Sequence, residues 1–437
     1  MTNENLKYLG PIKNGRTWSR IKYITSVPVQ TGAGEEALDY FDDSIRYIRI
    51  SDFDSNGKID EDKAAYIDRK IGLKFLIKKN DILAATAGAT VGKTLLYEGL
   101  KEDACYAGYL AKIRTDSYKM DSRFLFYQMI SKLMEDFREC AIKKSTIENI
   151  SASSYSNMYI HVTDIENQKR IADYLDKKVS AIDLLIEKEK KVVEELESYK
   201  INLITNEVFG SVATGKNKKH KWLTVELPDG YKIEKLKFYV SFGKGLSITK
   251  DDLIEEGIPV ISYGQIHAKF NTGTTMKEGM LRFVDEKYLK SGRKALLNVG
   301  DFIFADTSED KKGTGNFALN DIDGSIFAGY HTIVARPKKD FVSKYFAYQF
   351  LTDVWRNQVR SLCDGTRSYS ITQKILSETF IINPPKSVQE NVVKCLDKKC
   401  EAIDKLLALK EEKIEKLKEY KKSLIYECVT GRRDINA

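Results

Sequence analysis

Residues 168–210 read QKRIADYLDKKVSAIDLLIEKEKKVVEELESYKINLITNEVFG, and residues 389–431 read QENVVKCLDKKCEAIDKLLALKEEKIEKLKEYKKSLIYECVTG. The two stretches align without a gap, and both carry the sequence Ala-Ile-Asp at the same position, which ends at Asp183 in one and at Asp404 in the other. Similarity at one fixed offset is the signature of an internal repeat. We therefore interpret the chain as a duplication, each half of which ends in the same long element.

Both stretches predict long amphipathic helices. Apolar residues recur in steps of three and four between Lys and Glu residues, which is the pattern of a coiled-coil seam. The predicted seam consists of Ile182, Leu185, Ile186, Val193, Leu196 and Leu203 in the first helix and Ile403, Leu406, Leu407, Ile414, Leu417 and Leu424 in the second. Each helix has about 40 residues and a length of about 60 Å, so it cannot bury its stripe alone, and its twin is the obvious partner. Gly210 and Gly431 stand where C-cap glycines are expected. The alternative is two separate, solvent-exposed helices.

A mixed α/β segment precedes each helix. In the first segment, residues 18–160, the β-rich runs RYIRIS, DILAAT and GYLAKIR are followed by an aromatic helix, SRFLFYQMISKLMEDFREC. The second segment, residues 222–381, matches it with IPVISYGQI, DFIFADTS, GYHTIVARP and KYFAYQFLTDVWRNQVRSL. The offset that aligns the helices also pairs the Ala-Gly-Tyr sequence at 107–109 with that at 328–330. The duplication therefore extends upstream of the helices.

Composition narrows the class of protein. The 437 residues include 71 Lys and Arg against 63 Asp and Glu, a net charge of +8 that permits a polyanionic partner without requiring one. The six cysteines form no C-x-x-C pair and the four histidines are far apart, so no zinc or disulfide pattern is predicted. No segment reaches the roughly 18 apolar residues of a membrane span. We expect a soluble cytoplasmic protein with no metal site and no membrane partner.

Residues 87–94, AGATVGKT, look at first like a phosphate-binding loop. Gly92, Lys93 and Thr94 fit the end of that motif, but Ala87 stands where its first glycine belongs. The run that follows, LLYEGL, predicts a strand rather than the helix whose N-terminus would hold a phosphate. We favour a glycine turn between two strands, with a nucleotide site as the alternative.

Several features together resemble the specificity subunit of Type I restriction-modification enzymes. They are the turns NDILAATAGATVGK and GDFIFA, the AGY strand, the Gln-containing linkers DIENQKRI and NPPKSVQE, the helix IADYLDKKVSAIDLLI and the terminal LIYECVTGRRDI. The similarity runs over nearly the whole chain and includes the order and duplication of its parts.

This resemblance implies a mixed α/β fold. Two β-rich target recognition domains with small helices would be separated by two long antiparallel helices that form a coiled coil, with an internal pseudo-two-fold duplication. The expected parts are a first recognition domain at 1–160, a first long helix at 161–215, a second recognition domain at 216–381 and a second long helix at 382–437.

The resemblance also implies a function. Each recognition domain would read one half of a bipartite, asymmetric target in double-stranded DNA, and the coiled coil would fix the spacing between the halves. The coiled coil would dock two methyltransferase subunits and two restriction (translocase-nuclease) subunits, with a modification-only complex that lacks the restriction subunits as the alternative. The chain itself would be non-catalytic and bind no cofactor, with S-adenosylmethionine, ATP and Mg²⁺ held by the partner subunits. Lys93 would then face DNA phosphate.

Polar and basic residues at loop ends are the candidates for DNA contact, because Lys and Arg neutralise phosphates and polar side chains read base edges. In the first domain they are Arg49, Ser51, Asp52, Thr86, Thr90, Lys93, Lys143, Lys144, Ser145 and Thr146. In the second they are Ser262, Tyr263, Gln265, Thr307, Lys311, Lys312, Arg367, Ser368 and Tyr369. For each of them ordinary surface polarity is the alternative. Since the two domains differ in these loops, we predict two different half-sites.

Residues 383–386, NPPK, are similar to the Asn-Pro-Pro-aromatic loop with which amino methyltransferases hold a flipped adenine. Lys386 cannot stack on a base, so we interpret Pro384 and Pro385 as a stiff connection.

Two other classes of protein stay open as alternatives. One is an enzyme in its own right, either a methylase or a P-loop ATPase. The other is a coiled-coil scaffold that binds proteins without DNA specificity.

Overall fold

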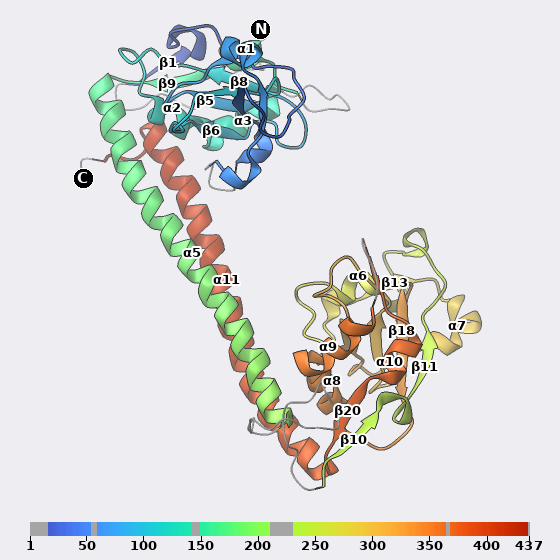
Figure 1. Cartoon of the computed structure of the whole chain (residues 1–437). Coiled ribbons are helices and arrows are strands. Elements are labelled where there is room, and N and C mark those ends of the chain that lie inside the picture. Colours follow the sequence, from blue (N-terminus) through green and yellow to red (C-terminus); the bar gives the residue numbers. More distant parts are fainter. Residues whose placement is uncertain (1–15, 54–58, 142–148, 210–229, 364–367, 436–437) are drawn as a thin grey trace. The chain divides into compact units, whose positions relative to one another are not determined.

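The computed structural model describes residues 16–53, 59–141, 149–209, 230–363 and 368–435 (Figure 1). Contacts divide the chain into two compact units. The first unit runs to Lys190 and takes up the chain again from Glu412, and the second is Lys191–Glu411. Each unit consists of a mixed α/β domain and a part of each of two long helices, α5 (Ile165–Phe209) and α11 (Lys386–Thr430).

The domain of the first unit contains a four-stranded antiparallel sheet in the order β2-β8-β5-β6 and a three-stranded sheet in the order β4-β3-β7. The β3–β7 pair is parallel, and β1 pairs with β9. The strands are β1 (Thr17–Arg20), β2 (Gln30–Thr31), β3 (Ser44–Ile48), β4 (Tyr66–Asp68), β5 (Ile82–Ala85), β6 (Thr94–Leu96), β7 (Ala104–Tyr106), β8 (Leu110–Ile113) and β9 (Tyr159–Val162). The helices are α1 (Arg69–Gly72), α2 (Ser122–Met129), α3 (Lys132–Ala141) and α4 (Ala152–Ser156).

The domain of the second unit repeats this topology. Its sheets run β11-β18-β14-β16 and β13-β12-β17, β10 pairs with β20, and an additional pair joins β15 to β19. The strands are β10 (Lys232–Lys235), β11 (Val240–Lys244), β12 (Ile258–Ile261), β13 (Arg282–Val284), β14 (Phe302–Ala305), β15 (Thr307–Ser308), β16 (Phe317–Leu319), β17 (Phe327–Ala328), β18 (Thr332–Pro337), β19 (Tyr369–Ser370) and β20 (Phe380–Asn383). The helices are α6 (Tyr263–Ile266), α7 (Tyr288–Ser291), α8 (Ser343–Leu351), α9 (Asp353–Leu362) and α10 (Gln373–Glu378). The predicted duplication and the mixed α/β fold class are confirmed.

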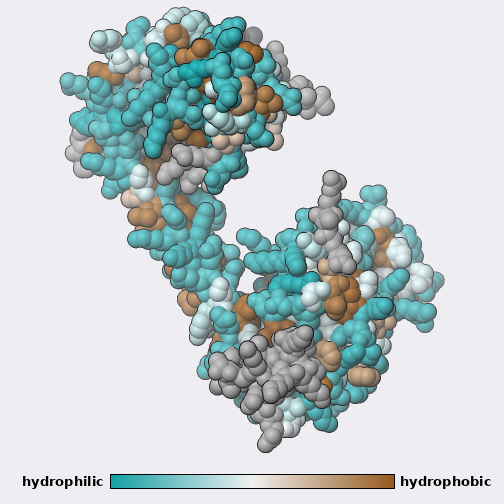
Figure 2. Space-filling model, viewed as in Figure 1, coloured by the Kyte–Doolittle hydropathy of each residue, from teal (hydrophilic) through white to brown (hydrophobic). Residues whose placement is uncertain are grey.

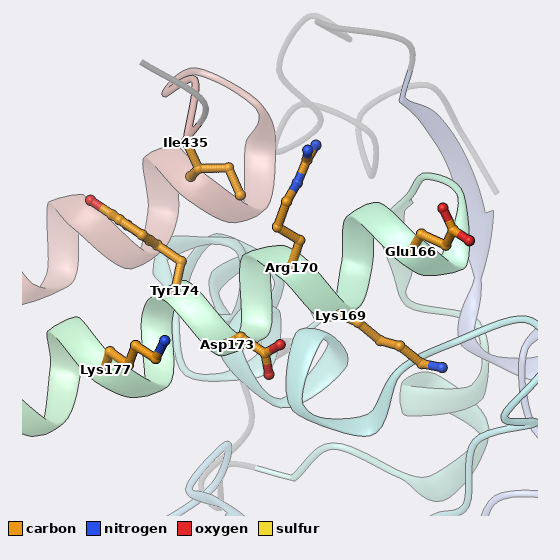
Figure 3. Close-up of a pocket in the computed structure, with 7 residues that line it drawn as sticks. All are labelled: Glu166, Lys169, Arg170, Asp173, Tyr174, Lys177 and Ile435. Atoms are coloured by element: carbon orange, nitrogen blue, oxygen red, sulfur yellow. The ribbon is translucent and has the colours of Figure 1, made fainter.

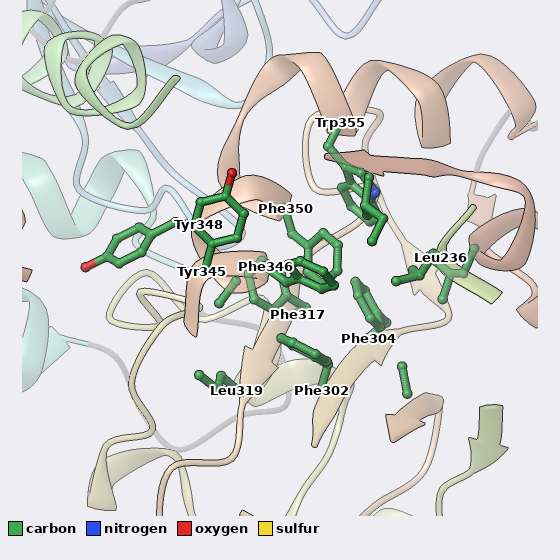
Figure 4. Packing of buried hydrophobic residues seen from close by; sticks show 14 of the residues in the cluster. Leu236, Phe302, Phe304, Phe317, Leu319, Tyr345, Phe346, Tyr348, Phe350 and Trp355 are labelled. Carbon is green, nitrogen blue, oxygen red and sulfur yellow. The ribbon is translucent and has the colours of Figure 1, made fainter. Parts of the chain in front are cut away.

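An aromatic core supports the four-stranded sheet of the second domain (Figure 4). Phe304 in β14 packs against Phe350 in α8 with 5.5 Å between ring centroids, and Phe350 lies 4.5 Å from Trp355 in α9. Such tilted aromatic pairs contribute about 0.5–1.5 kcal/mol each beyond the burial of their area. This core holds the strands from which the loops of the domain extend.

Each of the two predicted aromatic helices is in fact a pair of shorter helices, so the prediction of one continuous helix was wrong. Ser131 separates α2 from α3, and Thr352 separates α8 from α9. The Ser131 hydroxyl donates to the carbonyl of Gln128 at 2.8 Å, and the Thr352 hydroxyl donates to the carbonyl of Gln349 at 2.7 Å. These hydroxyls also accept from backbone N–H groups at the start of the next helix, which caps it.

The long helices pair antiparallel, as ion pairs in each unit show. In the first unit Asp183 pairs with Lys421 and Glu189 with Lys413, at 2.7 and 2.6 Å. In the second unit the pairs are Lys200 with Asp404 and Glu207 with Lys399, at 2.5 and 2.6 Å. In both units the residue numbers fall along α11 as they rise along α5. The predicted antiparallel arrangement is therefore confirmed.

The seam of the helix pair differs from the prediction at two positions. Ile182, Ile186 and Ile403 are buried, but Leu185 and Leu406 are 46% and 47% exposed. Leu185 is adjacent to Ile186 and Leu406 is adjacent to Leu407, and adjacent residues point about 100° apart around a helix. In both pairs the second residue faces the partner helix, so Leu185 and Leu406 lie outside the buried seam. Val193, Leu196, Leu203, Leu407 and Leu417 are partly buried, and Ile414 and Leu424 are buried. Gly431 has the positive φ of 74° expected of a C-cap, while Gly210 lies outside the described residues.

Each long helix is anchored to the domain that precedes it by the same hydrogen bonds. Tyr127 donates its phenolic hydrogen to Asp176 of α5 at 2.7 Å, and Tyr348 donates to Asp397 of α11 at 2.6 Å. Gln128, next to Tyr127 in α2, exchanges two hydrogen bonds with the backbone of His161 in β9, the strand that precedes α5. Gln349 in α8 does the same with Ile382 in β20, the strand that precedes α11. The base of each helix is thereby fixed to its own domain.

Candidate nucleic-acid interface

The glycine-rich stretch 87–94 is a turn between antiparallel strands. Ile82 of β5 pairs with Leu96 of β6, and Gly88 and Gly92 adopt positive φ values of 78° and 87°. Strand β6 follows the turn, so there is no helix N-terminus to hold a phosphate. The turn interpretation is confirmed, and this stretch lacks the helix that follows a phosphate-binding loop.

The first-domain candidates after β3 hold one another in place. Asp52 is fully buried, and Arg49 donates to its Oδ1 from Nε at 3.1 Å and from Nη2 at 2.9 Å. The Ser51 hydroxyl donates to the same oxygen at 3.2 Å. The carboxylate of Asp52 therefore positions Arg49 and Ser51, which are themselves accessible to solvent.

The candidates around β5 differ in exposure. Thr86 is buried, and its backbone N–H donates to Tyr109 O at 2.9 Å. Thr90 is exposed. The Lys93 ammonium group donates to Phe53 O at 3.1 Å and lies 5.8 Å from the Phe53 ring. The candidates Lys143, Lys144, Ser145 and Thr146 lie outside the described residues, as does Arg367 in the second domain.

In the second domain the structure brings together candidates from three loops. Tyr263 begins α6, and its ring lies 6.3 Å from that of His267. Nε2 of His267 is 2.8 Å from Thr307 O. Thr307 begins β15, which pairs with β19 at Tyr369 and Ser370. His267 thus connects Tyr263 to Thr307, and the β15–β19 pair connects Thr307 to the strand of Tyr369, although the three candidates come from distant parts of the sequence.

Two candidates after β12 bond to each other. The backbone N–H of Ser262 donates to Gln265 Oε1 at 3.1 Å, and Ser262 is buried whereas Gln265 is partly exposed. Ser262 therefore caps the start of α6 and does not lie at the surface. Ser368, next to β19, is exposed.

Lys311 and Lys312 are exposed on an ordered turn between β15 and β16. Arg356 of α9 donates to Asn316 Oδ1 at 2.8 Å, and Arg360 donates to Lys312 O at 3.2 Å. Burial lowers the pKa of Arg356 to about 10, which leaves the guanidinium group charged at neutral pH. Hydrogen bonds from Arg356 and Arg360 therefore fix this turn, which presents Lys311 and Lys312 to solvent.

A cavity of about 520 Å³ lies beside these loops and contains residues that sequence reasoning missed. Its lining includes Asp306, Tyr330 and His331. The backbone N–H of Asp306 donates to His331 O as that of Thr86 donates to Tyr109 O, so His331 occupies the place of Tyr109. The sequence offset had paired Tyr109 with Tyr330, one residue away, and the only available signal was the histidine that follows the Ala-Gly-Tyr sequence.

A second cavity, of about 490 Å³, lies at the start of α5 in the first unit (Figure 3). Charged side chains of both signs line it, among them Glu166, Arg170 and Asp173, together with Ile435. No candidate for DNA contact lies there, and the mixed charge does not favour a polyanion.

The sequence NPPK connects β20 to α11. Asn383 ends β20, and Lys386 begins α11 and pairs with Asp340 at 2.7 Å. The interpretation of the two prolines as a connection is confirmed.

In the described part of the chain no group of three or more His, Cys, Asp or Glu side chains is arranged to hold a metal ion. Nor is any helix among the described residues long and apolar enough to cross a membrane.

Known proteins were compared with the whole chain. The family model of the Type I restriction modification DNA specificity domain matches twice, over residues 33–195 and 228–419. The Type I restriction enzyme MjaVIII specificity subunit of Methanocaldococcus jannaschii is 24% identical over 361 residues, which are 82% of this chain and 80% of that protein. The putative type I restriction enzyme MjaX specificity subunit of the same organism is 23% identical over 392 residues, 86% of this chain and 85% of its own.

Structural likeness agrees with the sequence matches. A solved structure described as concerning complex assembly and conformational transition of the type I R-M system has a TM-score of 0.70 at 16% identity, over 96% of this chain and 99% of that one. At this identity the likeness shows the fold, and the two family-model matches show the family. The chain therefore belongs to the family of Type I restriction-modification DNA specificity subunits.

Proposed function

We propose that each of the two domains reads one half of a bipartite, asymmetric target in double-stranded DNA. One observation carries the proposal. The two domains share the same backbone hydrogen bond after their central strand, but the residues that this bond joins have different side chains. Thr86 and Tyr109 occupy in the first domain the places that Asp306 and His331 occupy in the second. Because base edges are read by side chains, different side chains on one frame would read different sequences.

The candidates for DNA contact divide into two roles. Lys311 and Lys312 would neutralise phosphates, which gives affinity that falls with salt and carries no sequence preference. Tyr263, Gln265 and Tyr369 would approach base edges in the second domain. In the first domain Lys93, Lys143 and Lys144 would contact phosphate. Arg49, Ser51, Thr90, Ser145 and Thr146 are the further candidates for DNA contact there.

We infer that α5 and α11 fix the gap between the half-sites and dock two methyltransferase and two restriction subunits. Leu184 and Leu185 on α5 and Leu406 and Leu409 on α11 are exposed, and hydrophobic residues lie among hydrophilic ones on the visible face of the long helices (Figure 2). Exposed apolar groups of this kind support a protein-binding surface. S-adenosylmethionine, ATP and Mg²⁺ would belong to those partners. We assign target recognition to residues 1–160 and 216–381. Spacing and partner docking are assigned to the long helices at 161–215 and 382–437.

The proposal is tested by co-expressing the chain with a methyltransferase partner and mapping methylated adenines in the host DNA. One split, asymmetric motif that needs both proteins is expected. If the proteins fail to co-purify and the chain shows no salt-dependent DNA binding, the scaffold function is correct instead.

Charge reversal separates phosphate contact from base reading. The double variant Lys311→Glu, Lys312→Glu should weaken binding to all DNA sequences alike and lower the slope of log K against log salt by about 2. The control Lys405→Glu, an exposed lysine of α11, should leave the slope unchanged. Binding titrations between 50 and 200 mM salt, roughly the range in which such contacts are lost, give the measurement. An unchanged slope in the double variant contradicts the phosphate role.

A further inference from the structure

His331 lies in the turn between β17 and β18 in a conformation that disfavours most side chains. Its φ is 55°, in the left-handed region. The turn is held there by a hydrogen bond from Asp306 N to His331 O at 3.1 Å and by one from the Thr332 hydroxyl to Gly329 O at 2.6 Å. The imidazole is 59% exposed, so packing does not offset the backbone strain. An exposed, strained residue that its neighbours hold in place is typical of a functional site.

Asp306 selects the tautomer of the His331 ring. Its Oδ1 lies 3.2 Å from Nδ1 of His331. The Thr307 hydroxyl donates to the same carboxylate oxygen at 2.9 Å, which steadies the carboxylate. Because a carboxylate only accepts, the neutral imidazole carries its hydrogen on Nδ1. Nε2 is then a hydrogen-bond acceptor.

His331 lines the 520 Å³ cavity, and two aromatic rings lie near its imidazole. The ring of Tyr263 lies 5.4 Å from that of His331, and the ring of Tyr330 lies 6.0 Å from it. Lys244 also lines the cavity and is exposed. An acceptor near aromatic rings, at a cavity that a lysine also lines, suits the edge of a nucleobase next to its phosphate.

We propose that His331 reads an exocyclic amino group in the second half-site, either adenine N6 or cytosine N4 in the major groove. These are the donors that the major groove offers to an acceptor. The keto oxygens of guanine and thymine are acceptors themselves and would face Nε2 without a hydrogen between them. The inference rests on the proposed function and adds to it the chemical group that one position of the target must carry.

The first domain lacks this arrangement at the same place in the fold. Tyr109 and Thr86 stand where His331 and Asp306 stand in the second domain. A phenolic hydroxyl both donates and accepts, so it does not select an amino group over a keto group as the Nδ1–H imidazole does. The effect of His331 is therefore confined to one half-site.

Two variants of the whole chain, each co-expressed with the methyltransferase partner, test the inference by mapping methylated sites. His331→Gly removes the ring and suits the positive φ, so it does not strain the fold. It should reduce discrimination at one position of the second half-site by about tenfold and leave the rest of the motif intact. His331→Arg replaces the acceptor with donors. It should change that position from the amino base to the keto base of the same size, adenine to guanine or cytosine to thymine.

Asn80→Gly is the matched control. Asn80 is the exposed non-glycine residue with a φ of 73° in the first unit, so the substitution repeats the backbone change away from the cavity. It should leave the motif unchanged. A wild-type motif that survives intact in both His331 variants overturns the inference alone. Failure of the wild-type chain to give any split motif overturns the proposed function and this inference with it.

Discussion

His161 in β9 and Ile382 in β20 occupy the same place in two copies of one strand pair, and only the histidine can bind a proton. The His161 ring lies 3.9 Å from that of Trp18 and is buried. Burial lowers the pKa of His161 to about 4, and the positive charges of Arg16 and Arg432 add to the effect. Protonation of His161 is therefore unfavourable while the first unit is folded.

The pH dependence follows from this shift. In the unfolded chain the histidine takes up its proton near pH 6.5, whereas in the folded chain it does so only near pH 4. Between these values the unfolded state binds the extra proton, so stability falls as pH falls, by about 3 kcal/mol at most. His161→Ile, which copies the second domain, should remove this decline. Hydrogen exchange of the β1 and β9 amides at pH 7 and pH 5, corrected for intrinsic rates, gives the measurement. An equal decline in both proteins would show that another group is responsible.

Candidate residues could be located from the sequence better than their roles. Polar residues directly after strands were identified, and the structure connects Tyr263, Thr307 and Tyr369 through His267 and the β15–β19 pair. Asp52 and Ser262 are buried instead, because a short polar side chain at a strand end also bonds to the backbone and side chains of the next turn, and the sequence does not distinguish these uses. His331 was missed because the repeat shifts by one residue in that turn.

At the scale of the element, the long helices show what periodicity predicts and what it leaves open. Both helices, their length and their pairing follow from the repeated apolar pattern. The pattern contains adjacent leucines and isoleucines, and it does not say which of them faces the partner. The side-chain positions decide this, with Ile186 inside the seam and the adjacent Leu185 outside it.

Two alanine substitutions three residues apart in α11 test the seam. Ile403→Ala should destabilise the second unit by about 2–4 kcal/mol, because it removes buried methyl and methylene groups and leaves a cavity. Leu406→Ala should cost about 0.5 kcal/mol, since its side chain is half exposed. Urea unfolding of both variants measures the difference. Equal losses would place the seam elsewhere.

At the scale of the whole molecule, the proposed spacer makes a geometric prediction. Seven residues of helix measure about 10 Å, the length of about three base pairs. Deleting residues 190–196 from α5 and 408–414 from α11 together keeps the heptad register of the antiparallel pair. The methylated motif should then keep both half-sites and lose about three base pairs of its gap. Deleting residues 190–196 alone breaks the register and should abolish assembly. An unchanged gap in the paired deletion would contradict the spacer role.

The duplication explains why the whole fold was more predictable than its surface. A repeat that preserves the sheet order, the anchoring glutamines and the long helices is visible in the sequence at one offset. The loops that carry the candidate contacts differ between the halves, so nothing in the repeat specifies their conformation. The break at Ser131 and Thr352 was also hidden, since it depends on a hydroxyl bonding to the preceding turn.

The central claim is that each domain reads its own half of the target, and exchange of one domain tests it most directly. Residues 232–383, from β10 to β20, are replaced by the corresponding domain of another specificity subunit, and methylated adenines are mapped after co-expression with the methyltransferase partner. The anchoring contacts of Asp397 in α11 should be supplied by the tyrosine of the incoming domain. The account predicts that one half-site changes to that of the donor, while the other half-site and the gap stay the same. Methylation of an unchanged target would contradict it.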